Sequence, residues 1–385
     1  MARTGRLAGM KVTARGLNRA TLARQLLLRR EKLGVVDAVH RIVALQAQEP
    51  ATPYVALWNR LARFDPSDLD RAFAHAAVVK GQLMRVTLHA VDVADYPAFH
   101  LAMQRTLRAA RLQDLRFTRT GLTSGDAEAL MPEVLAFTVE PRTNAQAEAW
   151  LDERLGPTEK PGVWWAFRQY GPIWHHPTGG PWSFGARPSY VAARATPATD
   201  PAAAMQRLAR RYLEGFGPAS VQDLAQFSTI YRPPAREAFL GLGDELVRFE
   251  GPGGEELFDV RGGELPPDAT PAPPRLMAMW DSTLLAYKDR GRIVPAAYRK
   301  VVIRDNGDVL PTLLVDGYVA GVWRPVEAGI EMTAFHHLPD DAWNGLEEEA
   351  RALLTLLADR DSAVYRRYAH WWDKNLPIAE RRMVS

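Results

Sequence analysis

The same order of elements recurs three times along the 385 residues, and this recurrence limits the fold more than any other feature. In its clearest form, residues 205–216 indicate an amphipathic helix and Ser220 caps a second helix, with Asp223 in the place of a capping-box acid. A third helix passes through 238–242, and two strands flank a Gly-Pro-Gly-Gly turn within 246–260. Three helices followed by a two-stranded hairpin are the elements of a winged helix.

The first occurrence of this order is predicted within residues 22–91. Leucine and valine residues at helical spacing indicate two helices over 22–43, and a third begins at Asp65. The β-branched segment 78–91 predicts a strand, a turn and a second strand, with Gly81 at the turn.

The second occurrence is predicted to begin near residue 143. Asn144 is the expected N-cap of a helix that Gly156 ends. The short apolar segment 163–167 is a candidate recognition helix. Residues 173–190 have a Gly/Pro-rich centre with aromatic flanks, which indicates a wing or a wide loop.

The remaining chain is rich in strand signals. Residues 261–275 are rich in Gly and Pro and predict a linker, and 301–315 predict a hairpin around the Asn306-Gly307 turn. A strong helix is expected over 347–357. The sequence therefore predicts an α+β fold with three tandem winged-helix modules and a C-terminal strand-rich region. The predicted boundaries are 1–140, 141–200 and 201–262 for the three modules and 263–385 for the C-terminal region.

Composition excludes several classes of protein. The chain has no Cys, which removes disulfides, thiolate zinc sites and cysteine nucleophiles, and which fits a reducing compartment. No stretch approaches the roughly 20 apolar residues of a membrane span. The N-terminus carries Arg3, Arg6 and Lys11 without the apolar region of a signal peptide, so we expect a basic arm on a soluble cytoplasmic protein. The net charge of +3 separates no functions by itself.

Familiar catalytic and metal-binding motifs are missing from the sequence. There is no phosphate loop, no GxGxxG after a strand, no HExxH and no GxSxG elbow. The pairs His175-His176 and His336-His337 are adjacent, and neighbours in a strand or helix point in different directions. We therefore expect no metal site and no cofactor.

The segment Leu45-Gln46-Ala47-Gln48 is the remaining candidate for chemistry. In an extended segment Gln46 and Gln48 would face the same way. Two neutral amides on one surface can hold a water molecule by donating and accepting hydrogen bonds at once. The alternative is a polar helix end that faces solvent, and spacing alone favours that alternative.

The chain resembles the AlkZ-like DNA glycosylases, a family of winged-helix DNA-binding proteins of the helix-turn-helix 42 type. Gln46-Ala47-Gln48 matches the family's Gln-apolar-Gln catalytic motif, and 85–89 match its Arg-x-Thr-Leu-His segment. Residues 280–285, 289–292 and 315–323 match its C-terminal region. These matches follow the family's order over nearly the whole chain. Gln48, where some branches have Asp, indicates the Gln-Gln branch.

This resemblance implies a monofunctional glycosylase that acts on double-stranded DNA carrying an alkylated base. A guanine alkylated at N7 is already cationic, so its departure needs no general acid. Gln46 and Gln48 are the implied catalytic residues, and they would orient the attacking water. A glutamine cannot act as a general base, so normal guanine and neutral lesions are expected to stay intact. The branch is associated with resistance to alkylating natural products and with the unhooking of interstrand crosslinks.

The resemblance also implies an open, concave DNA channel, because a bulky adduct cannot enter the tight pocket that flips a normal base. A hairpin would probe the minor groove. The candidates for DNA contacts are Arg85, Thr87, His89, Arg290, Arg292, Arg299 and Lys300. For each arginine or lysine among them the alternative is a charged side chain that only faces solvent. For His89 the alternative is a core position with its hydrogen bonds satisfied.

Two other functions remain open from the sequence. A winged-helix transcription regulator would need neither the glutamine pair nor the C-terminal strands, and it would usually be a two-fold dimer. A resistance protein that sequesters the toxin would bind it without DNA. Three modules in one chain favour a monomer associated with the nucleoid.

Overall fold

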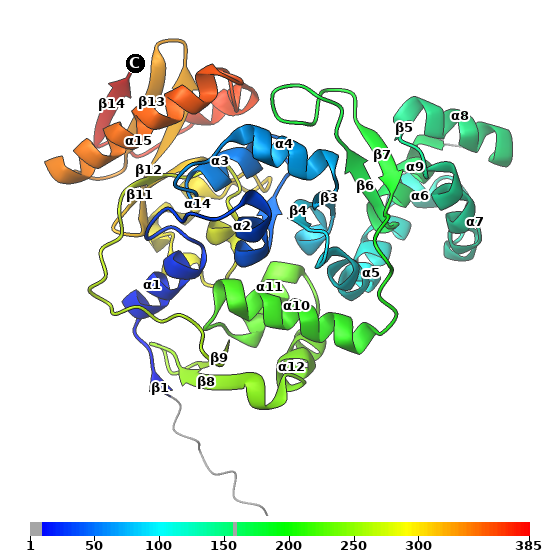
Figure 1. The fold of residues 1–385 in the computed structure, drawn as a ribbon, viewed down its shortest axis with the longest axis horizontal. Helices are drawn as coiled ribbons and strands as arrows, with labels where there is room; N and C mark the ends of the chain where they lie inside the picture. The colour runs from blue at the N-terminus through cyan, green and yellow to red at the C-terminus, as the bar shows by residue number, and fades with distance from the viewer. Residues whose placement is uncertain (1–9, 157–159) are drawn as a thin grey trace, which may run out of the picture.

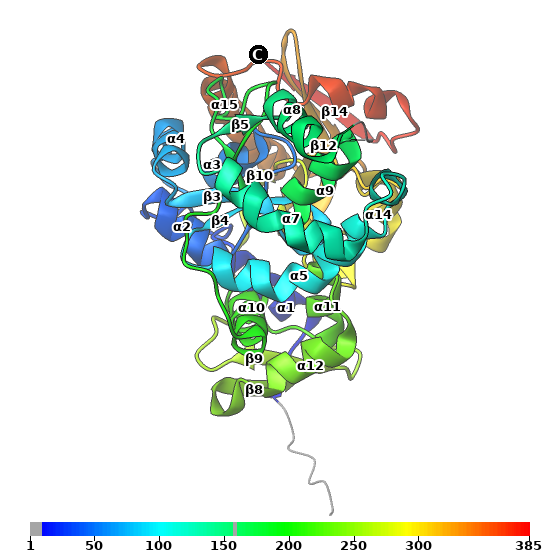
Figure 2. The same cartoon turned by 90° about the vertical axis from the view of Figure 1, so that its right-hand side faces the viewer.

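The computed structural model describes residues 10–156 and 160–385. The third winged-helix module has every element that the sequence predicts, and it lies below α5 in Figures 1 and 2. The Ser220 hydroxyl accepts from the Asp223 backbone N–H, and the Asp223 carboxylate accepts from the Ser220 N–H at 2.9 Å. This capping box starts α11. The elements are α10 (Pro201–Phe216), α11 (Val221–Ser228), α12 (Arg232–Leu240), β8 (Leu246–Glu250) and β9 (Glu256–Val260).

The first module contains both predicted strands, the helix predicted around Val36 and Val39, and the helix that begins at Asp65. The helix predicted from Leu22 is misplaced, because α1 ends at Arg24 and the chain turns at Leu26, where φ is 57°. The turn between the strands also lies elsewhere. Gly81 is inside β3, where an added Cβ would stand 3.0 Å from the Tyr96 ring. Close packing therefore favours glycine at this position, and the chain turns at Met84–Val86 instead. The elements are α1 (Ala14–Arg24), α2 (Val35–Ile42), β2 (Leu45–Gln46), α3 (Thr52–Trp58), α4 (Pro66–Ala74), β3 (Val78–Gln82) and β4 (Leu88–Asp92).

The second module differs from its prediction at the helix start. Thr143 is the N-cap of α8, where it forms a capping box with Gln146. Asn144 is the first helical residue, and its side chain accepts from Trp164 Nε1 at 2.9 Å. The elements are β5 (Arg142–Thr143), α8 (Asn144–Leu155), α9 (Lys160–Tyr170), β6 (Ile173–His176) and β7 (Ser189–Ala192). Three further helices precede the module: α5 (Tyr96–Leu112), α6 (Leu115–Thr118) and α7 (Ser124–Phe137).

The C-terminal region is rich in strands, as predicted, but one predicted hairpin is wrong. Residues 299–302 form the helix α14, and only a single bridge joins Ile303 to Val309. Val302 is fully buried, so tertiary packing overrides the strand preference of these β-branched residues. The hairpin that forms turns at Asp316-Gly317, where both residues have positive φ. The elements are β10 (Arg275–Leu276), α13 (Ser282–Leu285), β11 (Thr312–Val315), β12 (Tyr318–Val326), β13 (Gly329–Ala334), α15 (Asp340–Ala358) and β14 (Glu380–Val384).

Sheets connect the modules. One six-stranded sheet, in the order β2-β4-β3-β6-β7-β5, contains strands from both the first and the second module. The short N-terminal strand β1 (Met10–Lys11) pairs in parallel with β8 of the third module. A five-stranded sheet from β10 to β14 forms the C-terminal region. The module boundaries stay predictions, since the sheets run across two of them.

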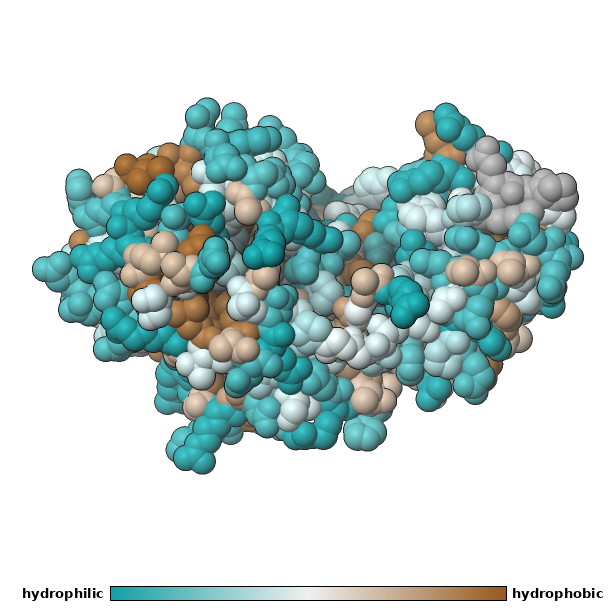
Figure 3. All heavy atoms as spheres, turned by 90° about the horizontal axis from the view of Figure 1, so that it is seen from above, coloured by the Kyte–Doolittle hydropathy of each residue, from teal (hydrophilic) through white to brown (hydrophobic). Residues whose placement is uncertain are grey.

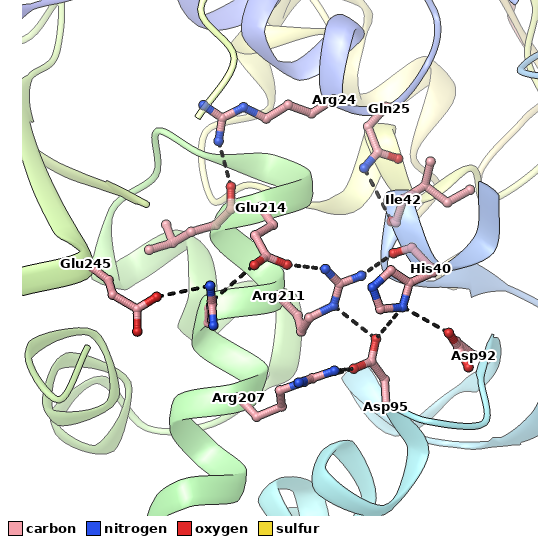
Figure 4. A network of polar contacts seen from close by, with 12 residues as sticks. Arg24, Gln25, His40, Ile42, Asp92, Asp95, Arg207, Arg211, Glu214 and Glu245 are labelled. Carbon is pink, nitrogen blue, oxygen red and sulfur yellow. Dashed lines mark hydrogen bonds and ion pairs between the residues drawn. The ribbon is translucent and has the colours of Figure 1, made fainter. Parts of the chain in front are cut away.

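A buried charge network joins the first and third modules (Figure 4). The fully buried Asp95 carboxylate accepts from Arg207 at 2.7 Å and from Arg211 at 3.0 Å, and both arginines belong to α10. Arg211 also donates to the carbonyl oxygen of His40, and the His40 ring lies 2.9 Å from Asp92. Satisfied polar networks of this kind hold elements in one orientation.

The space-filling view shows a hollow between two lobes (Figure 3). The helices α6 to α9 belong to the right-hand lobe, and the C-terminal sheet with α15 belongs to the left-hand one (Figure 1). The strands β3 and β4 lie between them. In the described ranges, no helix has the length and apolar character to cross a membrane.

Candidate active site

Gln46 ends the edge strand β2 and is buried, with 4% of its surface exposed. Its partner in the antiparallel pairing with β4 is His89, and the next backbone bond runs from Ala47 N–H to the Leu88 carbonyl at 2.8 Å. Directly opposed residues of an antiparallel pair project from the same face. The pairing therefore places the Gln46 amide beside the His89 ring.

Arg85 brings these two side chains together. It lies in the turn between β3 and β4, with φ at 54°. Arg85 Nη2 donates to Gln46 Oε1 at 2.8 Å and lies 3.1 Å from His89 Nε2. Arg85 Nη1 donates at 3.2 Å to the carbonyl oxygen of Phe227, in α11. The site thus combines the first and the third module.

His89 is fully buried and neutral. Burial, and then the charge of Arg85, hold the pKa of His89 well below its usual range. His89 Nδ1 lies 3.1 Å from the Thr87 carbonyl oxygen, to which it donates, so Nε2 is free to accept from Arg85. The Thr87 hydroxyl donates to the Met84 carbonyl oxygen at 3.1 Å and closes the turn. Both residues support Arg85, which agrees with the core role that the sequence left open for His89.

The two glutamines have different environments. Gln46 is buried, whereas Gln48 is exposed in a bend after β2 has ended. Arg85 donates to Gln46 Oε1 and so fixes the orientation of the Gln46 amide. The extended segment that would align the two amides ends at Gln46. The site therefore combines a buried, oriented amide at Gln46 with an exposed amide at Gln48.

Positive charge gathers beside this site. Arg290 is partly buried, and its Nη1 has no acceptor among the described residues. Burial, and then the charge of Arg299, lower the pKa of Arg290 to about 10. Burial, and then Arg290, lower the pKa of Arg85 to about 9. Arginines that repel one another, with an unpaired N–H group, favour an anion such as a DNA phosphate.

The other predicted DNA contacts have different surroundings. Arg292 Nη1 donates to the Pro218 carbonyl oxygen at 2.9 Å, and its guanidinium lies 3.9 Å from the centre of the Tyr287 ring. Arg292 thus packs between the third module and the C-terminal region. Arg299 and Lys300 are exposed on α14.

Lys80 is a buried residue that the sequence did not single out. It lies on β3 with its ammonium 4.3 Å from the centre of the Phe184 ring, and burial lowers the pKa of Lys80 to about 8. The strand register pairs Lys80 with Ala90 and Gly81 with His89. Neighbours in a strand alternate between faces, so Lys80 lies on the opposite face from His89. No local sequence pattern would reveal the burial of Lys80, since that burial depends on long-range packing.

The family model described as "DNA glycosylase AlkZ-like" matches residues 39–356 of this chain. An interstrand DNA cross-link repair glycosylase of Streptomyces sahachiroi is 24% identical over 360 residues, which cover 89% of this chain and 95% of that protein. The solved structure of the S. sahachiroi DNA glycosylase AlkZ has a TM-score of 0.78 and 23% sequence identity, and the match covers 91% of this chain and 98% of that one. That structural similarity bears on the fold, and it agrees with the mixed helix and strand content that the sequence predicts.

Proposed function

The chain belongs to the AlkZ-like DNA glycosylase family, and we propose that it hydrolyses the N-glycosidic bond of cationic N7- or N3-alkylated purines in double-stranded DNA. The observation that carries this proposal is the 2.8 Å bond from Arg85 to Gln46 Oε1. It fixes the amide of an implied catalytic residue. Family membership also favours a glycosylase over the transcription regulator that the sequence left open.

The chemistry near Gln46 suits a leaving group that is already charged. An alkylated purine that carries a positive charge departs as a neutral base, so it needs no proton donor. The side chains that contact Gln46 and Arg85 include His89, which is neutral, and no carboxylic acid among the described residues bonds to either. A neutral lesion such as hypoxanthine would need the acid that this arrangement lacks.

The two amides orient the attacking water, which adds to the oxocarbenium-like sugar and then loses its proton to solvent. Arg85 occupies one lone pair of Gln46 Oε1, which leaves a second lone pair and the amide N–H groups for a water molecule. The exposed Gln48 would contact the same water from the DNA side. The cationic Arg85 cannot stabilise the developing positive charge on the sugar, so we assign that stabilisation to the neighbouring DNA phosphates. Arg290 would hold one of them.

We extend the substrate class to bulky adducts and interstrand crosslinks from a genotoxic natural product, in self-resistance or repair. The curated relative acts on crosslinks by its name. The exposure of Gln48 and the hollow between the lobes support an open approach of the lesion (Figure 3). One chain supplies all three modules, so we expect a monomer that acts in the cytoplasm on nucleoid DNA.

The test is release of 7-methylguanine from a labelled duplex, with EDTA present and with strand cleavage assayed before and after alkali. Wild type is compared with Gln46→Ala and Gln48→Ala, and with Gln113→Ala as an exposed glutamine outside the site. We expect release by wild type and by Gln113→Ala, strong loss in the other two, and strand breaks only after alkali. If neither 7-methylguanine nor a bulky N7 adduct is released, the proposal of catalysis is wrong. Tight binding of free toxin without DNA would then favour sequestration.

A further inference from the structure

A second group of arginines surrounds Trp165, away from the glutamines. Trp165 is a partly exposed residue of α9. The guanidinium of Arg116, from α6, lies 3.8 Å from the centre of its ring, and that of Arg111, from α5, lies at 4.9 Å. Stacking on an aromatic ring fixes the plane of a guanidinium and leaves its N–H edge free to donate.

These arginines carry more positive charge than their neighbours neutralise. A cavity of about 530 Å³ is lined by Arg116, Arg119, Arg168 and Trp165, with Glu148 as an acid in its lining. Asp114 accepts two hydrogen bonds from Arg116, at 2.9 and 3.0 Å.

The inner part of the group has unused donors. In the part of the chain that the structure describes, the Nε atoms of Arg111 and Arg168 are buried without an acceptor. Burial, and then repulsion from Arg116, lower the pKa of Arg111. A fold that holds like charges together in this way gains when an anion binds among them.

The group is connected to the candidate active site. Arg111 Nη2 donates at 3.3 Å to the carbonyl oxygen of Val86, which follows Arg85 in the turn. In Figure 1, α6 and α9 lie on the opposite side of β3 and β4 from α14, which carries Arg299 and Lys300. Positive side chains therefore flank the strands of the site on both sides.

We propose that Arg111, Arg116, Arg119 and Arg168 bind the phosphate backbone of the duplex on one side of the lesion. This inference rests on the proposed function, because it takes DNA as the ligand. Arginine suits phosphate, since its planar fork donates two parallel hydrogen bonds to phosphate oxygens. Such contacts position the duplex without reading its sequence. They would set the register of the lesion against Gln46 through the shared turn.

The experiment measures binding of the full chain to an undamaged 25-base-pair duplex by fluorescence anisotropy, over a series of salt concentrations. The variant is Arg116→Ala with Arg119→Ala, two exposed residues whose loss leaves the core intact. The matched control is Arg29→Ala with Arg63→Ala, two exposed arginines of the first module. A further variant, Arg116→Lys with Arg119→Lys, keeps the charge.

We expect the alanine pair to reduce the slope of log K against log salt by about 2, since each lost phosphate contact removes about 0.9. Affinity at moderate salt should fall roughly 10- to 100-fold, while the lysine pair retains the slope and the control behaves as wild type. An unchanged slope and affinity would overturn the proposal. The proposal would also be overturned if the alanine pair keeps its affinity for DNA and loses binding to polyglutamate. That result would show that this surface binds an acidic protein. If the wild-type chain releases no alkylated base but the alanine pair still lowers the salt slope, only the glycosylase function is refuted and the DNA-binding proposal stands.

Discussion

Arg85 combines an unusual backbone conformation with contacts to the first and the third module. Its φ of 54° lies in a region that few residues other than glycine adopt, and its Nη2 reaches both Gln46 and His89. The sequence motif predicted a DNA contact for this residue. The structure places it where it can fix the orientation of the Gln46 amide, so we treat it as a positioning residue.

Arg85→Lys tests that role. Lysine keeps the positive charge, but a single ammonium cannot bond to Gln46, His89 and the Phe227 carbonyl oxygen from one position. The single-turnover rate of 7-methylguanine release should fall roughly 10²-fold, because small losses of alignment have effects of that size. Arg71→Lys, on the exposed face of α4, is the control. A weaker affinity for DNA with an unchanged rate would show that Arg85 contacts the backbone instead.

His100 gives a pH dependence of stability. Its Nε2 donates to the Tyr170 carbonyl oxygen at 3.1 Å, and burial lowers the pKa of His100 to about 4. The unfolded chain binds this proton near pH 6.5, so the native state loses stability as the pH falls from about 7 towards 4. Between pH 7 and pH 5 the loss is about 2 kcal/mol. Urea unfolding of His100→Gln should show a smaller difference between these pH values, and an identical difference would contradict the assignment.

Single elements show which features the sequence could predict. The capping box at Ser220 and the start of α4 at Asp65 depend on neighbours in the chain, and both were predicted. The helix α14 was not, because burial of Val302 decides its form. For the same reason the short buried helix α3 was missed.

The site was predictable to a similar extent. Its motif residues could be found from the family resemblance. The contact between Arg85 and Phe227 could not be predicted from the sequence, because it spans two modules and leaves no local pattern. The alternation of the Gln46 segment suggested two aligned amides, but the chain bends after β2.

A buried ion pair joins the turn after α3 to the N-cap residue of α13. Asp281 accepts from Arg60 Nη1 at 2.8 Å and from Nη2 at 2.9 Å, and both side chains are fully buried. Asp281→Asn leaves the arginine charge buried and unpaired, which should lower the free energy of unfolding by about 3–5 kcal/mol. Asp68→Asn, in an exposed pair with Arg71, should change it by less than about 1 kcal/mol. Urea denaturation measures both, and a loss at Asp281 as small as at Asp68 would show that solvent reaches the pair.

At the scale of the molecule, the site depends on parts that are distant in sequence. The first module supplies Gln46 and Arg85, the third supplies the Phe227 carbonyl oxygen, and the C-terminal region supplies Arg290. The Asp95 network and the shared six-stranded sheet hold these parts together (Figure 4). Contacts within the chain therefore hold these distant parts of the site in place. The space-filling view shows a hollow between the two lobes (Figure 3).

This arrangement predicts tolerance of lesion size together with a strict requirement for charge. Gln48 is exposed, so a bulky N7 adduct or a nitrogen-mustard crosslink should be released within about tenfold of the 7-methylguanine rate, because neither has to enter a closed pocket. Hypoxanthine and uracil, which leave as anions, should stay in place, since no acid is positioned to protonate them. Single-turnover release from duplexes that differ only in the lesion measures both effects. Rapid release of 7-methylguanine with an intact crosslink would indicate a closed pocket, and substantial excision of hypoxanthine would indicate an acid that the contacts of Gln46 do not show.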